Sequence, residues 1–372
     1  PYFSTFGHHT TPPAAALASK LAELAPGNLN HVFYGCGGSV ANDTAVRIIH
    51  FYFNQLGQTT KKKIISRIDG YHGSTYMAMS ITGVEFDHVG FDVDNQMVHH
   101  ISCPNPYRRT EGMSLEDFCD SKVVELEDKI LELGADNVAA FFAEPIFGAG
   151  GVIVPPLGYH RKTQEVCNKY GVLYVSDEVV TGFGRLGHMF ASKDEFDLQP
   201  DIITCAKGLT SGYLPLSATI LSDDIYDVIS IPQAKGALFT HGFTYSGHPV
   251  CCAAGLKNIE IMERENLCEH VNDVGDYFET QLKTLEDLDI VGEVRGRKFM
   301  MCIENVANKQ TKELLHEDAE VGTRIANHCQ TRGLIQRIGP VRIKDRGVDQ
   351  FEHRALMIGS DVLCTHPPFD GD

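Results

Sequence analysis

The sequence has no long apolar run, no Cys-x-x-Cys pair and no excess of basic side chains. No stretch of its 372 residues approaches the roughly 20 consecutive apolar residues of a membrane-spanning helix, and no signal peptide is expected at its start. Lys and Arg number 32 against 49 Asp and Glu, so the formal net charge is −17. This balance argues against nucleic acid or an anionic membrane surface as the main partner.

Cysteine and histidine also lack the spacings that bind metals. The 11 cysteines are scattered, apart from the adjacent pair Cys251 and Cys252. The pairs His8-His9 and His99-His100 do not have the i, i+4 spacing of a helical metal site. We therefore expect no metal and a reduced, cytoplasmic location, in which most thiols serve as small buried apolar groups.

The composition is that of a globular protein, with 43% hydrophobic and 22% charged residues. The sequence contains no internal repeat and no low-complexity segment. It begins at Pro1 and stops at Asp372 without features of finished domain ends. We therefore expect a fragment in which an N-terminal segment and part of the C-terminal domain are missing.

Short apolar runs alternate with amphipathic stretches over the first two thirds of the chain. This alternation is typical of a mostly parallel sheet that helices cover on both faces. The pattern of predicted elements changes after about residue 267, where helices flank short strands. We predict a large α/β domain over residues 1–267 and a small α+β domain over residues 268–372. Strands are expected at 31–34, 63–68, 138–143, 172–176, 201–205, 217–221, 291–294 and 299–303, and helices at 14–24, 40–56, 120–133, 159–169, 268–285 and 314–332.

Two strand-like runs end in residues that suit pyridoxal phosphate (PLP) chemistry. Lys207 follows one run, thirty residues after Asp177 and Glu178 end another. A PLP enzyme needs a lysine amine for a Schiff base and a carboxylate that keeps the pyridine nitrogen protonated. In open α/β sheets the carboxyl ends of strands face the ligand crevice. On these residues alone, a solvated lysine and a helix-capping or ion-paired carboxylate stay open as alternatives.

Two further segments have the arrangement of a cofactor site. Gly37-Gly38-Ser39 lies between a predicted strand and a predicted helix, where backbone N–H groups bind phosphate. Tyr71-His72-Gly73 follows another strand, and an aromatic ring there can cover a flat heterocycle. A steric glycine turn and a core tyrosine are the alternative readings.

Five ordered segments resemble the class III aminotransferases, which are dimeric PLP enzymes of fold type I. Among them the chain is most similar to the ω-amino acid or amine:pyruvate branch. The resemblance extends from about residue 1 to residue 337. The segments are Gly38-Ser-Val-Ala-Asn-Asp-Thr44, Tyr71-His-Gly73, Asp177-Glu-Val-Val-Thr-Gly-Phe-Gly-Arg185, Asp201-Ile-Ile-Thr-Cys-Ala-Lys-Gly-Leu209 and His241-Gly-Phe-Thr-Tyr-Ser-Gly-His-Pro249.

The resemblance implies roles at individual positions. Lys207 would form the Schiff base and move the proton, and Asp177 would pair with the pyridine nitrogen. The other implied contacts with the cofactor are Val179 and Tyr71 on the two ring faces, His72 beside Tyr71, Gly38 and Ser39 at the phosphate, Glu144 near the cofactor and Thr244 from the partner subunit. Arg337 matches a mobile arginine that binds substrate carboxylates. A homodimer with shared active sites follows from this, and a tetramer stays open.

Three positions depart from the family pattern. Val40 stands where the family usually has glutamate, and Lys298 replaces a glycine. Val180 stands where several branches carry a glutamine, and an aliphatic residue there is typical of the pyruvate-dependent branch. Residues 340–363 do not follow the common pattern, so the substrate contacts of the small domain are left open.

The leading hypothesis is transamination from an ω-amino acid or amine to pyruvate or another keto acid, by ping-pong half-reactions. A PLP-dependent decarboxylating transaminase or an aminomutase is the second hypothesis. The third is a cofactor-binding protein without turnover. Carbon dioxide release, or turnover of an amino substrate without any keto acid, would favour the second.

Overall fold

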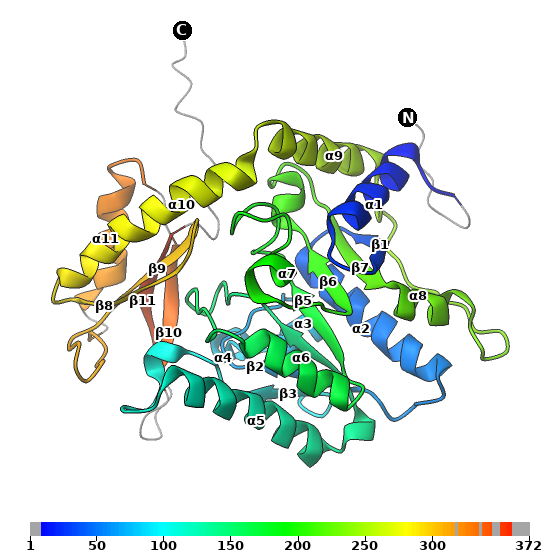
Figure 1. Cartoon of the computed structure of the whole chain (residues 1–372), viewed down its shortest axis with the longest axis horizontal. Helices are drawn as coiled ribbons and strands as arrows, with labels where there is room; N and C mark the ends of the chain where they lie inside the picture. Colours follow the sequence, from blue (N-terminus) through cyan, green and yellow to red (C-terminus); the bar gives the residue numbers. More distant parts are fainter. Residues whose placement is uncertain (1–8, 317–318, 335–336, 344–349, 359–372) are drawn as a thin grey trace, which may run out of the picture.

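The computed structural model describes residues 9–316 and 319–334, and the backbone of residues 337–343 and 350–358. The first part of the chain forms a seven-stranded sheet in the order β1-β7-β6-β5-β4-β2-β3 (Figure 1). β7 is antiparallel to both of its neighbours, and the other described pairs in this sheet are parallel. The strands are β1 (Leu29–Gly35), β2 (Lys63–Arg67), β3 (Val98–Ile101), β4 (Val138–Ala143), β5 (Leu173–Asp177), β6 (Ile202–Cys205) and β7 (Ser217–Ser222).

Helices cover both faces of this sheet, as the alternation of strands and helices predicts. Neighbouring residues of a strand point to opposite faces, so Phe142 packs with α2 while Phe141 packs with α5 and α6. Ile203 of β6 packs in a third cluster, with α1 and α9. The helices over residues 9–264 are α1 (Pro12–Leu24), α2 (Gly38–Gln55), α3 (Tyr76–Ile81), α4 (Glu85–His88), α5 (Leu115–Leu133), α6 (Tyr159–Lys169), α7 (Ala191–Phe196), α8 (Asp223–Ser230) and α9 (Pro249–Arg264).

Local sequence accounts for the ends of these helices. Ser114 accepts a hydrogen bond from the backbone N–H of Asp117 at the start of α5, a serine N-cap. Gly134, with φ +82°, ends the same helix. Pro249 begins α9, where a missing N–H costs nothing.

A second sheet has the order β10-β11-β9-β8, and its described pairs are antiparallel. Figure 1 shows α10 running along this sheet, with α11 beside it. Val294 and Ile303 pack against Phe278 of α10 in one apolar cluster. The elements are α10 (Leu267–Lys283), β8 (Val291–Arg297), β9 (Met300–Asn305), α11 (Val321–Gln330), β10 (Arg337–Ile343) and β11 (Gln350–Ile358).

The structure gives a physical account of the lysine at position 298. Lys298 has φ +51° in the β8–β9 turn, a left-handed conformation that favours glycine. Its ammonium donates to Asp276 at 2.6 Å and to the carbonyl of Asn272 at 3.2 Å, both on α10. A Cβ added at Gly275 would lie 2.7 Å from Lys298 Cδ, so this glycine makes room for the lysine stem.

Some elements differ from the sequence-based expectation. β3 and α9 were not expected, although Pro249 at the start of α9 is a recognisable signal. The helix expected over 314–332 covers only Val321–Gln330, because Glu320 has φ +44° and stops the helix from extending upstream. α5 begins at Leu115, five residues before the expected start.

Two observations bear on class and environment. Among the described residues, no helix is long and apolar enough to cross a membrane. The ten described cysteines are all free, and five of them are buried.

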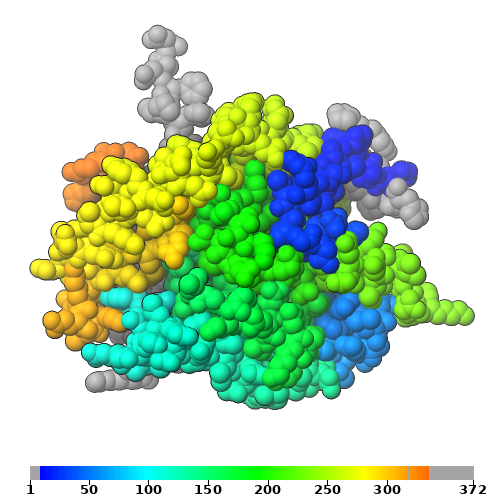
Figure 2. Space-filling view, viewed as in Figure 1, coloured from blue at the N-terminus to red at the C-terminus, as the bar shows by residue number. Residues whose placement is uncertain are grey.

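The first helix packs against α9. Figure 2 shows the space-filling surface, with α1 in dark blue lying close to α9. Leu17 of α1 and Ile259 of α9 belong to the same buried cluster.

Candidate active site

The carboxyl ends of the parallel strands surround one cavity of about 800 Å³. Asp177 ends β5, Glu144 follows β4 and Lys207 lies just after β6. The cavity also receives Gly38 and Ser39 from the start of α2. Its volume lies within the range of about 300–1,000 Å³ that holds small-molecule ligands. Of the residues expected at the cofactor, those that line it are Gly38, Ser39, Tyr71, His72, Glu144, Asp177, Val179 and Lys207.

Asp177 is held by three hydrogen-bond donors. Asn42 Nδ2 donates to Asp177 Oδ2 at 2.8 Å, and the backbone N–H of Val179 donates to Oδ1 at 3.1 Å. His72 Nδ1 lies 2.8 Å from Oδ2, and it must donate there because an ionised carboxylate can only accept. All of these groups except Val179 are buried. The arrangement fixes the direction of the carboxylate.

Asn42 extends this network to the strand that precedes Lys207. Thr204 Oγ1 on β6 donates to Asn42 Oδ1 at 2.9 Å. Asn42 Nδ2 also donates to the backbone carbonyl of His72 at 2.7 Å. With its oxygen satisfied by Thr204, the asparagine must turn its NH₂ group toward Asp177.

Glu178 binds the start of α7 and takes no part in the hydrogen bonds around Asp177. Its carboxylate accepts hydrogen bonds from the backbone N–H groups of Ala191 and Ser192, each at 2.8 Å, at the start of α7. Thr181 Oγ1 donates to it as well, at 2.9 Å. Burial raises the pKa of Glu178. The structure thus assigns the capping alternative to Glu178 and leaves Asp177 facing the cavity.

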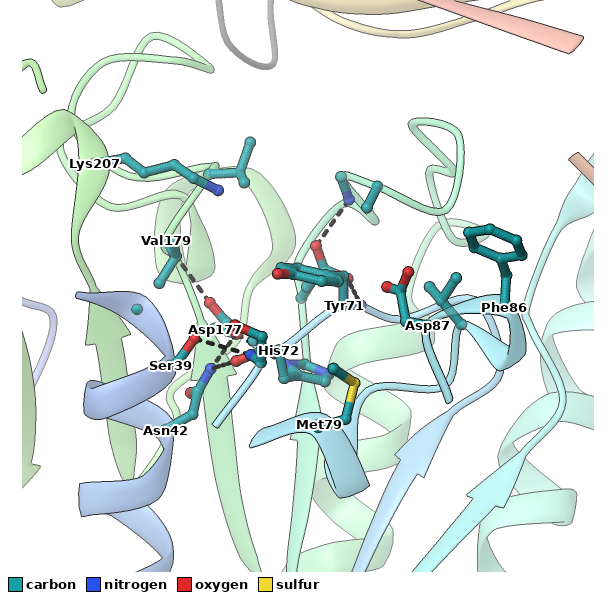
Figure 3. Close-up of a pocket in the computed structure, with 18 of the residues that line it drawn as sticks. Ser39, Asn42, Tyr71, His72, Met79, Phe86, Asp87, Asp177, Val179 and Lys207 are labelled. Atoms are coloured by element: carbon teal, nitrogen blue, oxygen red, sulfur yellow. Dashed lines mark hydrogen bonds and ion pairs between the residues drawn. The ribbon is translucent and has the colours of Figure 1, made fainter. Parts of the chain in front are cut away.

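Lys207 has an unusual backbone conformation. Its φ is +28°, and the preceding Ala206 has φ −160° and ψ −133°. A residue outside the populated regions costs about 1–3 kcal/mol and recurs at functional sites. Figure 3 shows the Lys207 side chain extending over Val179 and Asp177 toward the cavity.

Glycines allow two loops to meet at the start of α2. Gly73 has φ +130°, and a Cβ there would lie 2.3 Å from Ser39 Oγ. Ser39 Oγ accepts from the backbone N–H of Ser74 at 3.0 Å, so its own hydrogen can be donated to a ligand. A Cβ at Gly38 would lie 3.1 Å from Val179, which brings the turn close to the ring-facing valine. The first turn of α2 presents the N–H groups that suit a phosphate.

Glu144 is buried beneath Tyr71. It accepts from the backbone N–H of Tyr71 at 3.0 Å and from that of Gly148 at 2.8 Å. Burial raises the pKa of Glu144, and the negative charge of Asp177 adds to the effect. Glu144 thus fixes the position of Tyr71 through its backbone.

Of the two remaining expected site residues, Thr244 does not line the cavity, and Arg337 is described by its backbone alone. Thr244 is exposed on the loop between α8 and α9. Arg337 begins β10, but its side chain lies outside the described part of the structure. The departures Val40 and Val180 are accommodated, with Val40 in the first turn of α2 and Val180 lining the cavity.

The sequence interpretation missed three parts of the site. Asn42 lies one helical turn after Gly38, and this spacing could have shown that both point to one side. Thr204 lies 162 residues from Asn42, so nothing local links them. The third part is the segment 84–91, five members of which line the cavity beside Met79: Val84, Phe86, Asp87, Val89 and Phe91.

The residues fit PLP, the cofactor that the motifs imply. The α2 turn offers donors for a phosphate, Asp177 offers a carboxylate for a ring nitrogen, and Lys207 offers an amine. The buried Nε2 of His72 has no hydrogen-bond partner among the described residues, although Nδ1 is engaged by Asp177.

Comparisons with known proteins identify the family. The model of the family "Aminotransferase class-III" matches residues 2–354. The chain belongs to the class III aminotransferases. It is thus an enzyme of a PLP-dependent transferase family with the fold type I architecture, as the sequence motifs predict.

Relatives support the predicted branch. The chain is 42% identical to the putrescine–pyruvate aminotransferase of Pseudomonas aeruginosa, over 91% of this chain and 73% of that protein. It is 40% identical to γ-aminobutyrate transaminase 1 of Solanum lycopersicum, over 91% of this chain and 66% of that protein. An ω-transaminase from Pseudomonas jessenii, solved in complex with PMP, matches with a TM-score of 0.90 and 38% identity, over 99% of this chain and 78% of that one. The resemblance to the amine:pyruvate branch is confirmed by these relatives.

Proposed function

We propose that this aminotransferase binds PLP in the cavity and moves an amino group from an amine or ω-amino acid to pyruvate or another keto acid. The observation that carries the proposal is the meeting of Lys207, Asp177 and the Gly38-Ser39 turn around one cavity. The similarity to a putrescine–pyruvate aminotransferase supports an amine donor, and the similarity to γ-aminobutyrate transaminases keeps ω-amino acids in the class.

PLP, when bound, supplies an aldehyde and an electron-withdrawing ring that make a carbon bearing an amino group acidic. The chain provides the rest. The first turn of α2 and Ser39 would bind the phosphate, Tyr71 and Val179 would cover the two ring faces, and Lys207 would hold the cofactor through its amine.

Asp177 orients the ring and preserves its charge. With three donors on its oxygens, the carboxylate is held in a fixed direction and would pair with a protonated pyridine nitrogen. His72 and Asn42 act on the cofactor through Asp177, and Glu144 acts through Tyr71.

Lys207 moves the proton. Its flexible side chain starts from a fixed, strained backbone above Val179, which would keep the amine on one side of the cavity. From there the amine would accept the proton from the donor carbon that bears the amino group and hold it for return to the bound molecule. The donor leaves as a carbonyl compound, and the keto acid enters for the reverse sequence.

The remaining predictions belong to the same proposal. Thr244 reaches the phosphate from the partner subunit of a homodimer, and Arg337 binds the carboxylate of the keto acid. The chain divides into a PLP-binding domain over residues 1–267 and a smaller domain over residues 268–372, and the enzyme works in the cytoplasm.

Absorbance of the purified protein tests the proposal. Each candidate amine is added singly and pyruvate afterwards. We expect the visible band of the bound cofactor to disappear with the amine and to return with pyruvate, and we expect the variant Lys207→Ala to lose this cycle. A Lys207→Ala variant that still cycles would contradict the mechanism, and carbon dioxide release would redirect it to a decarboxylating reaction.

A further inference from the structure

The backbone turn that carries Lys207 is strained at two positions. The chain forms a short 3-10 helix over Lys207–Thr210, and we call residues 206–212 the lysine turn. Lys207 has φ +28° and Ser211 has φ +50°, both in a region that costs free energy for a residue with a side chain. Such conformations persist where the surrounding contacts hold them. The direction of the Lys207 side chain, shown in Figure 3, therefore depends on what holds the lysine turn.

Asn258 of α9 binds one side of the lysine turn. Its Nδ2 donates to the backbone carbonyl of Gly208 at 2.8 Å and to that of Leu209 at 3.2 Å. Backbone carbonyls can only accept, so the NH₂ group of the asparagine must face them. The oxygen Oδ1 is then left for Ser211, whose hydroxyl donates to it at 2.7 Å. One side chain thus bonds three residues of the turn.

The other side of the lysine turn packs against the loop that follows β5. A Cβ added at Gly208 would lie 2.9 Å from Phe183 Cβ. Leu209 and Phe183 belong to one buried cluster, and Ile259 fixes α9 in the same cluster. The turn therefore lies between a packed loop and a packed helix, and the hydrogen bonds of Asn258 set its orientation in that space.

Asn258 does not line the cavity, so its effect on a bound molecule passes through Lys207. When PLP binds, the Lys207 amine adds to the aldehyde carbon and water leaves as the carbon–nitrogen double bond forms. This bond forms readily only if the amine already lies close to the aldehyde carbon in the right direction.

We propose that Asn258 is a positioning residue for Lys207. It holds the lysine turn in its strained conformation, so that the amine is in place to bond the cofactor aldehyde. Without Asn258 the turn relaxes toward commoner φ values, and part of the free energy of bonding is then used to restore it. The inference rests on the proposed function, because it concerns the bond between Lys207 and PLP.

Two forms of the cofactor distinguish this role from a general role in folding. PLP has an aldehyde that can bond to Lys207, whereas pyridoxamine phosphate has an amine in its place and cannot. The full chain is loaded with either form, and the loss of cofactor on dialysis is followed by absorbance. Asn258→Ala should lose PLP about tenfold or more faster than the wild type, because two hydrogen bonds to the lysine turn are gone. Loss of pyridoxamine phosphate should change by less than about twofold, as expected for an independent site.

A milder variant and a matched control accompany Asn258→Ala. Ser211→Ala frees Oδ1 of the asparagine and keeps the two donors, so it should show the same selective loss of PLP to a smaller extent. Asn272→Ala is the control, because Asn272 Nδ2 donates to the backbone carbonyl of Gly187 at 3.1 Å and neither residue lines the cavity. It removes the same kind of bond and should leave the loss of both cofactor forms unchanged.

The variant Lys207→Ala completes the test. Neither cofactor form can bond to it, so adding Asn258→Ala should not make the loss of PLP any faster. An unchanged loss of PLP from Asn258→Ala, an equal acceleration for both forms, or a further effect in the Lys207→Ala background would overturn the positioning role and leave the proposed function in place. If Lys207→Ala retains PLP as firmly as the wild type, the bond to Lys207 is absent, and the proposed function fails together with the inference.

Discussion

At the residue scale, Asp177 is supported by side chains from three segments that are far apart in the chain. Asn42 comes from α2, His72 from the loop after β2, and Thr204 from β6 by way of Asn42. Among the described residues, each buried side-chain polar atom of this network has a hydrogen-bond partner except His72 Nε2. Removing one member should therefore affect the direction of the Asp177 carboxylate as well as the stability of the fold.

The variant Thr204→Val tests this coupling, because it keeps the shape of the side chain and removes the donor to Asn42. We expect the free energy of unfolding to fall by about 1–3 kcal/mol, the cost of an unsatisfied buried acceptor. We also expect faster loss of PLP on dialysis, since Asn42, with its oxygen no longer held by Thr204, would fix Asp177 less firmly. Urea unfolding and cofactor absorbance measure the two effects.

Thr219→Val is the matched control. Thr219 Oγ1, on the neighbouring strand β7, is equally buried and donates to the backbone carbonyl of Ala41 at 3.0 Å, outside the network. It should cost similar stability without faster cofactor loss, and Thr204→Ser should restore retention. If the two valine variants lose PLP at the same rate, Thr204 has only a structural role.

At the scale of elements, the strands around the site were predictable and the contacts between them were not. Lys207, Asp177 and Tyr71 each follow an apolar run, so their place at the carboxyl edge of the sheet follows from local pattern. The strand pattern alone did not separate the roles of Asp177 and Glu178, since the capping role of Glu178 depends on where α7 begins, and it was the family resemblance that singled out Asp177. Residues 84–91 contain no long run with the periodicity of a strand or a helix. Their place beside Tyr71 therefore depends on tertiary contacts with α3.

Asp201, which lies just before β6, makes the stability of the folded chain depend on pH. Its carboxylate accepts from the backbone N–H of Tyr174 at 2.7 Å, and burial raises the pKa of Asp201 to about 6. A carboxyl with a raised pKa holds its proton longer in the folded than in the unfolded chain. Its contribution to stability is thus complete below about pH 4 and is lost as the pH rises through about 6.

The variant Asp201→Asn should remove this loss, because the amide can accept the same bond without a charge. Relative to wild type, its urea midpoint should rise between pH 4.5 and pH 7. Asp197→Asn serves as the control, since Asp197 is exposed and its hydrogen bond from Lys193 lowers its pKa, which puts its titration below this range. A difference between Asp201→Asn and wild type that stays constant with pH would contradict the assignment.

At the scale of the whole molecule, the position of Thr244 distinguishes an active site made by one chain from an active site shared between two chains. In the single chain it lies exposed on the loop before α9, away from the cavity. The loop is anchored at its base, where His241 Nε2 lies 3.0 Å from Thr44 Oγ1 of α2. A fixed loop that presents a hydroxyl outward is suited to a second copy of the chain, as a shared site in a homodimer requires.

Subunit mixing tests the shared site directly. Lys207→Ala removes the amine from a subunit's own site, and Thr244→Asp places a carboxylate against the phosphate in the partner's site. Each homodimer should be nearly inactive, the second because like charges repel in a desolvated pocket. In a mixed dimer one site carries both defects, while the other combines the wild-type Lys207 and the wild-type Thr244. Random mixing of equal amounts should thus restore about a quarter of the wild-type activity, because half of the dimers are mixed and each has one intact site of two. If both residues served the same subunit's site, every site in the mixture would carry one defect and no activity would return.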